Sequence, residues 1–218
     1  MTGKMCGVDE AGRGPVIGPL VVSGVAMEDD SALDGLGIKD SKKLTPGRRE
    51  ELAEKIRSLG EVVTVQVPAE EIDILREEMT LNELEVNLFA SVLDKLRPRV
   101  AYVDSADVNA DRFGEDIGRK LDLDVEIISK HKADDLYPIV SAASIIAKTT
   151  RDSEVRKIEN EIGEEIGSGY PSDPITIEFL EKWIRENHDL PPHTRKSWET
   201  TRKTLQRAKM KKLDEFEG

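Results

Sequence analysis

The stretch that decides how the chain is interpreted is GVDEAGRGP, residues 7–15. It begins as a short apolar strand, passes through two adjacent acids, Asp9 and Glu10, and continues into Arg13 between two glycines. Acids and a glycine-flanked arginine this close together indicate a site that holds metal ions and then a phosphate. Since adjacent residues of a straight strand point to opposite faces, Asp9 and Glu10 serve one site only if the chain bends there. The two glycines lead us to expect that bend.

Two more acids follow predicted strands further along the chain. Asp104 ends the predicted strand 100–104, and Asp134 lies just beyond the predicted strand 124–129. A single acid after a strand is most often a helix cap or a turn residue. Acids at the ends of three strands indicate a common site if those strands are neighbours in the sheet. Carboxylates without nearby cysteines favour Mg²⁺ or Mn²⁺ over zinc, and two such ions can cleave a phosphodiester.

The order of the predicted elements is typical of an α/β protein with a mixed sheet. Strands are predicted over residues 5–9, 18–27, 61–67, 100–104 and 124–129. Helices are predicted over residues 46–59, after Pro68, between Thr80 and Pro98, and over 110–121, 139–166, 175–186 and 197–212. Thr45 and Thr80 are the expected N-caps. This order predicts a five-stranded mixed sheet flanked by helices. We expect a catalytic domain over residues 1–173 and a C-terminal helical extension, residues 174–218, packed on it.

Composition and charge limit the class of protein. The 218 residues are 35% charged and carry a formal net charge of -12, which argues against a generic nucleic-acid binder. The segment Arg195–Lys212 nevertheless holds eight Lys or Arg and one acid, so it is either a basic binding arm or a solvated helix face. The single cysteine, Cys6, fits a reducing compartment. No apolar run approaches the roughly 20 residues that cross a bilayer, so we expect a cytoplasmic protein.

Several other residues could contact a nucleic acid, each with a plainer alternative. Gly12 and Gly14 complete neither a dinucleotide fingerprint nor a P-loop, but they would let Arg13 approach a phosphate closely. Tyr170 lies in a Gly/Ser/Pro loop, where it either packs or stacks on a sugar or base. Lys42 and Lys43 are either solvated or in contact with a phosphate. His131, three residues before Asp134, either supports the metal ligands from behind or is a surface residue.

These motifs together resemble type 2 ribonuclease H (RNase HII), over nearly the whole chain. They are DEAGRGP (9–15), KDSKKL (39–44), VDS (103–105), KAD (132–134), SAASIIAK (141–148), RD (151–152) and GSGYPSDP (167–174). Several long motifs in the right order are far more specific than any one alone. The compact length and simple C-terminal helices look most like the archaeal branch.

The resemblance implies an RNase H-like fold and a set of catalytic residues. The four metal-binding carboxylates of the family fall on Asp9, Glu10, Asp104 and Asp134, where two Mg²⁺ or Mn²⁺ ions would act. The implied reaction is cleavage of the RNA strand of RNA/DNA hybrids and incision 5′ of single ribonucleotides in duplex DNA. It leaves 3′-hydroxyl and 5′-phosphate ends. The implied biological role is ribonucleotide excision repair and primer or hybrid removal.

The resemblance also implies how the substrate is recognised. The family's glycine-rich loop, which reads the ribose 2′-hydroxyl, falls on Gly12, Arg13 and Gly14. Tyr170 would pack on the deoxyribose that follows. The expected partners are RNA/DNA hybrids and ribonucleotide-containing DNA. We expect the protein to be a monomer and not to associate with a membrane. The C-terminal end has too little pattern to predict a sliding clamp as partner.

Two alternatives stay open. The first is another RNase H-like nuclease, such as a resolvase or a type 3 ribonuclease H. The type 3 enzyme would carry an additional N-terminal substrate-binding domain, which we expect to be absent because only eight residues precede Asp9. The second is a module that binds hybrids through a structural metal site without cleaving them.

Overall fold

The computed structural model of the chain describes residues 3–38 and 44–216, with side chains described up to residue 207. It forms two compact units. The sheet unit consists of residues 1–11, 21–66 and 79–150, and the helical unit of residues 12–20, 67–78 and 151–218. The expected boundary at residue 173, between a catalytic domain and a C-terminal extension, stays a prediction.

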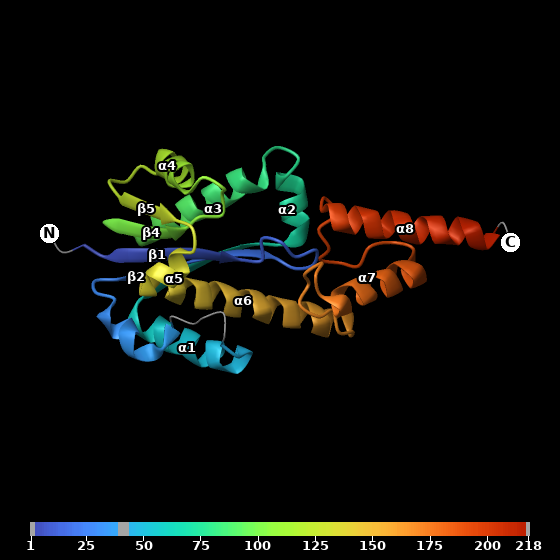
Figure 1. Cartoon of the computed structure of the whole chain (residues 1–218), viewed down its shortest axis with the longest axis horizontal. Helices are drawn as coiled ribbons and strands as arrows, with labels where there is room; N and C mark the ends of the chain where they lie inside the picture. The colour runs from blue at the N-terminus through green and yellow to red at the C-terminus, as the bar shows by residue number, and fades with distance from the viewer. Residues whose placement is uncertain (1–2, 39–43, 217–218) are drawn as a thin grey trace. The chain divides into compact units, whose positions relative to one another are not determined.

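A five-stranded mixed sheet lies at the centre of the sheet unit (Figure 1). Its strands are β1 (Met5–Ala11), β2 (Leu20–Met27), β3 (Glu61–Val67), β4 (Val100–Asp104) and β5 (Glu126–Lys130). Their order in space is β3-β2-β1-β4-β5. The central strand β1 runs antiparallel to β2 and parallel to β4, and β4 runs parallel to β5. The predicted α/β class with a five-stranded mixed sheet is confirmed.

Helices cover both faces of this sheet. Figure 1 shows α3 and α4 on one face, and α1 with the first part of α6 on the other. The sheet unit holds the 3-10 helix η1 (Ser31–Leu36) and α1 (Pro46–Leu59), α3 (Leu81–Leu96), α4 (Ala110–Lys120), α5 (Ala133–Leu136) and the start of α6 (Pro138–Ile162). None of the helices in the described part of the chain combines the length and the apolar character that a membrane span requires.

Local capping signals explain where two of these helices begin. The Thr45 side chain accepts a hydrogen bond from the backbone N–H of Arg48, at the start of α1. Thr80 and Glu83 form a reciprocal capping box at the start of α3. Both satisfy backbone donors that a helix N-terminus leaves without an intrahelical partner. The two predicted N-caps are therefore confirmed.

The core of the sheet unit depends on two close approaches to the sheet. The first half of α6 is buried, as its small apolar residues predict. A Cβ on Gly7 of β1 would lie 2.3 Å from the backbone of Ile139, so only glycine lets α6 pack this closely. On β2, a Cβ on Gly24 would lie 2.4 Å from the side chain of Val92 in α3. Glycines on adjacent strands thus fix how near the covering helices come.

The helical unit contains α2 (Ala69–Leu75), the end of α6, α7 (Pro174–Asn187) and α8 (Glu199–Phe216). Its apolar core comprises Val16, Ile17, Val155, Ile158, Ile166, Phe179 and Leu180. The predicted helix 139–166 is too long, because α6 ends at Ile162 and Gly163 takes a left-handed conformation with φ 78°. The last predicted helix is confirmed in place but begins at Glu199 and reaches Phe216.

Candidate metal centre and glycine loop

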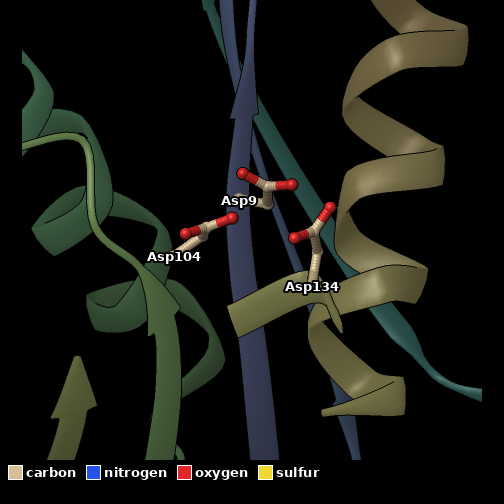
Figure 2. A group of neighbouring side chains, drawn as sticks. All are labelled: Asp9, Asp104 and Asp134. Carbon is tan, nitrogen blue, oxygen red and sulfur yellow. The ribbon is translucent and has the colours of Figure 1, made fainter. Parts of the chain in front are cut away.

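Three carboxylates come together in the sheet unit. One oxygen each of Asp9, Asp104 and Asp134 lies within 4.8 Å of the other two (Figure 2). Asp9 and Asp134 are buried, and Asp104 is half-buried. Such a group of acids, held apart from water, is a site of strong mutual repulsion unless protons or a cation neutralise it.

The strand order explains why these acids meet. The parallel ladder between β1 and β4 ends with Val8 opposite Val103, so Asp9 and Asp104 follow the same end of neighbouring strands. Asp134 follows β5, the next strand along, after a turn at Lys132. Ligand sites of α/β sheets form at the carboxyl ends of such strands. The condition set from the sequence, that the acid-bearing strands be neighbours, is met.

Glu10 does not join this group. The strand β1 continues regularly to Ala11, with Asp9 opposite Ser23 and Glu10 opposite Val22 on β2. The bend predicted at Asp9 and Glu10 is therefore wrong, since pairing with β2 keeps both residues extended. The chain leaves the strand at Gly12, where φ is 87°. Alternation along the strand puts the Glu10 side chain on the face opposite Asp9, while its backbone N–H donates to Asp9 Oδ1 at 2.7 Å.

Burial dominates the electrostatics of Asp9. Loss of hydration, and after it the negative charge of Asp104, raises the pKa of Asp9 to about 7. A hydrogen bond from the Ser144 hydroxyl and the positive charge of Lys148 act in the opposite direction. Lys148 Nζ also donates to Ser144 Oγ at 2.8 Å. Sequence reasoning missed this pair; the signal was two polar residues four positions apart in an otherwise apolar stretch of α6.

The donor chemistry of the three acids suits a divalent cation. Carboxylate oxygens are the ligands that Mg²⁺ and Mn²⁺ prefer, whereas zinc favours nitrogen and sulfur donors. A cation among these oxygens would also relieve the repulsion that raises the pKa of Asp9. The residues present therefore fit the predicted metal.

The helical unit holds the predicted glycine loop together with Tyr170. A Cβ on Gly12 would lie 2.4 Å from the carbonyl oxygen of Pro19, and its φ of 87° is itself unfavourable for other residues. A Cβ on Gly14 would lie 3.6 Å from Cε1 of Tyr170, so the tyrosine ring lies directly beside the loop. The Arg151 guanidinium lies 5.0 Å from the centre of the same ring. Lys42 and Lys43 lie outside the described residues.

Arg195 supports the glycine loop from within the helical unit. Its side chain is fully buried and donates to three carbonyl oxygens: Gly12 O at 2.6 Å, Arg13 O at 3.0 Å and Gly18 O at 2.9 and 3.0 Å. Its guanidinium lies 4.8 Å from the centre of the Trp198 ring. Burial, followed by the positive charge of Arg151, lowers the pKa of Arg195 to about 9. The sequence places Arg195 in a basic segment, but it is a structural residue that this reasoning missed.

Comparisons with known proteins agree with this fold. A family model described as Ribonuclease HII matches residues 6–201. The Ribonuclease HII of Methanocella arvoryzae is 48% identical over 219 residues, 99% of this chain and 98% of that protein. The crystal structure of ribonuclease H2 from Pyrococcus horikoshii OT3 superposes with a TM-score of 0.88 at 47% identity, covering 94% of this chain and 99% of that one.

A further solved structure, the PCNA:RNase HII complex from Archaeoglobus fulgidus, matches with a TM-score of 0.85 at 44% identity. The match covers 90% of this chain and 94% of that one. Fold and acid cluster together define an RNase H-like nuclease, a class of phosphodiester hydrolases. Within that class the chain belongs to the Ribonuclease HII family. The predicted family, its archaeal character and the assignment as an enzyme are confirmed, and family membership decides against type 3 ribonuclease H.

Proposed function

We propose that the chain is an endoribonuclease that cleaves RNA in RNA/DNA hybrids and incises duplex DNA on the 5′ side of single embedded ribonucleotides. The observation that carries this proposal is the convergence of Asp9, Asp104 and Asp134 in a member of the Ribonuclease HII family. The expected products end in a 3′-hydroxyl and a 5′-phosphate. This activity would serve ribonucleotide excision repair.

The acids are the proposed ligands of two divalent ions, Mg²⁺ or Mn²⁺. Bound there, the ions would supply an activated water and stabilise the departing 3′ oxygen. Burial of Asp9 and Asp134 keeps their carboxylates away from bulk water, which strengthens their attraction to a cation. The Ser144 hydroxyl orients Asp9 by a hydrogen bond. Glu10 remains the proposed fourth ligand: although its side chain leaves β1 on the face opposite Asp9, its backbone N–H contacts Asp9, and Glu10→Gln tests whether the side chain takes part.

Selectivity for a ribonucleotide is assigned to the glycine loop. Gly12, Arg13 and Gly14 are proposed to contact the ribose 2′-hydroxyl, the group that distinguishes RNA from DNA. Tyr170 is proposed to pack on the adjacent deoxyribose. Two observations support these roles: the Gly14 backbone lies beside the tyrosine ring, and Arg195 holds the carbonyls of the loop. The proposed phosphate contacts come from Lys42 and Lys43, whose positive charge suits them to it.

One assay tests the reaction. A DNA duplex with a single ribonucleotide is incubated with the protein, with EDTA, Mg²⁺ or Mn²⁺, beside an all-DNA duplex of the same sequence. We expect metal-dependent incision 5′ of the ribonucleotide and an intact control duplex. Asp134→Asn should abolish incision while the variant still binds the duplex. Binding without any incision by the wild-type protein would instead indicate a non-cleaving hybrid-binding module.

We extend the proposal to a sliding clamp as a partner. The support is the solved complex of the Archaeoglobus fulgidus relative with PCNA. Gel filtration of this chain with the clamp of its own source, beside a chain truncated after residue 207, tests for a complex. Co-elution of both chains would place the contact before residue 208, and co-elution of neither would reject the partner.

A further inference from the structure

Two loops beyond the sheet control how Asp104 and Asp134 are placed relative to each other. The ladder between β4 and β5 ends with Asp104 opposite Lys130. Asp134 lies four residues past that pair, in the one-turn helix α5. The separation of these two carboxylates therefore depends on contacts beyond the sheet. One is the hydrogen bond from Ser141 Oγ of α6 to Asp134 O at 2.7 Å, and the others join the turn after β5 to the loop after β4.

Among the described residues, three hydrogen bonds that join the two loops carry the argument. Two of them have backbone donors: Ser105 N–H donates to Lys130 O at 3.0 Å, and Ala133 N–H donates to Asp104 Oδ1 at 3.3 Å. The third joins a side chain, His131 Nε2, to Val108 O at 3.1 Å. Since a carbonyl oxygen only accepts, Nε2 is the donor, and the bond exists in both the neutral and the charged imidazole.

The turn that His131 enters is one that needs external support. Lys132, the next residue, has φ 54° and ψ 42°, a left-handed conformation that a residue with a Cβ adopts at a cost of roughly 1–2 kcal/mol. Such conformations persist where surrounding contacts hold them. Within the turn, Asp135 N–H donates to Lys132 O at 3.0 Å. His131 adds a contact from outside the turn.

The carbonyl that accepts this bond belongs to a well-anchored loop. Asp107 is buried, and its carboxylate accepts from Asn82 Nδ2, from Arg112 Nη2 and from the backbone N–H of Asn109. Val108 is 94% exposed and accepts the bond through its backbone carbonyl, so this hydrogen bond lies at the surface. The loop after β4 is thus held in place, and a hydrogen bond to it from His131 restrains the turn before Asp134.

We propose that His131 is a positioning residue for the metal centre. It fastens the turn that carries Asp134 to the loop that follows Asp104, and thereby sets the distance at which the two carboxylates meet a cation. The inference rests on the proposed metal site. Without this bond the turn is freer to move in the metal-free protein, so ordering it becomes part of the cost of binding. If the typical net contribution of one hydrogen bond falls wholly on this ordering, metal binding weakens about fivefold.

Direct measurement of Mn²⁺ binding by titration calorimetry, without nucleic acid, tests this inference. His131→Ala should bind Mn²⁺ about fivefold more weakly than wild type. His131→Gln should recover most of the affinity, because its amide nitrogen reaches about as far as Nε2, whereas the shorter His131→Asn should not. Val108→Ala is the matched control, since it removes the exposed side chain but keeps the accepting carbonyl.

A kinetic measurement separates positioning from substrate contact. At saturating Mn²⁺, His131→Ala should show the wild-type KM for duplex, with the loss confined to the metal concentration needed for half-maximal rate. Equal Mn²⁺ affinity of wild type and His131→Ala, or no recovery in His131→Gln, would overturn the inference alone. Failure of the wild-type protein to bind Mn²⁺, or wild-type affinity in Asp134→Asn, would overturn the proposed metal site as well.

Discussion

Removal of the Arg195 side chain should destabilise the helical unit and its glycine loop. Arg195 reaches three carbonyl oxygens, and its bonds to Gly12 O and Gly18 O are buried. A buried carbonyl left without a donor costs about 1–3 kcal/mol, so two of them give about 2–6 kcal/mol. Removing a desolvated charge offsets part of this loss. We therefore expect Arg195→Ala to lower the free energy of unfolding by about 2–4 kcal/mol.

Tryptophan fluorescence during urea unfolding measures the loss of stability in the helical unit itself. Both tryptophans, Trp183 and Trp198, belong to the helical unit, so their emission reports on that unit, whereas circular dichroism reports on the whole chain. Arg195→Lys keeps the charge but lacks the planar fork of donors, so its stability should lie nearer that of Arg195→Ala than that of wild type.

The matched control is Lys203→Ala on α8, where Lys203 forms an exposed ion pair with Glu199. Exposed pairs of this kind contribute about 0–1 kcal/mol. The reasoning would be refuted if Arg195→Ala unfolded at the same urea concentration as this control. It would also be refuted if Arg195→Lys behaved as wild type, because charge alone would then suffice.

Substitutions at Asp9, Gly12 and Thr80, with two comparison variants, test separate features. In metal-free protein the raised pKa of Asp9 makes folding take up a proton, so its contribution to stability falls as pH rises from about 4 to about 7. Asp9→Asn should therefore raise the melting temperature in EDTA by an amount that grows across this range; a constant difference would contradict the raised pKa. Gly12→Ala should cost at least about 2 kcal/mol, from the left-handed φ and the nearby Pro19 oxygen. Gly47→Ala, with open space around it in α1 of the sheet unit, should instead be neutral or stabilising by up to about 1 kcal/mol in urea unfolding followed by circular dichroism. Thr80→Ala should cost about 1 kcal/mol through loss of the capping box, and Thr80→Ser should restore it.

Elements set by neighbouring residues were predictable. The strands 61–67 and 100–104 have the predicted bounds, and the helices after Thr45 and Thr80 begin where their caps indicate. Capping depends on residues three positions apart, so the information lies within one short segment. The candidate acids were also visible, because each stands next to a predicted strand end.

Features that depend on distant partners were not predictable. The bend expected at Asp9 lies at Gly12 instead, because pairing with β2 keeps β1 extended to Ala11. Arg195 stood in a basic segment whose composition suggested solvent, while its hydrogen-bond partners lie near the other end of the chain. His131 is exposed, as its surface alternative predicts, and its hydrogen-bond partner Val108 lies 23 positions earlier in the chain.

The amino-acid sequence by itself determined the family, the α/β class and the residue types available for metal binding. Only the tertiary structure decided which acids meet. The strand order places β1 beside β4 and β4 beside β5, which brings Asp9, Asp104 and Asp134 together, and Glu10 is not among the acids that meet there. The physical reason is that strand pairing and burial are long-range choices. Which strands pair, and which side chains are buried, depends on how α3 and α6 pack against the sheet. A local pattern of residues does not contain this information.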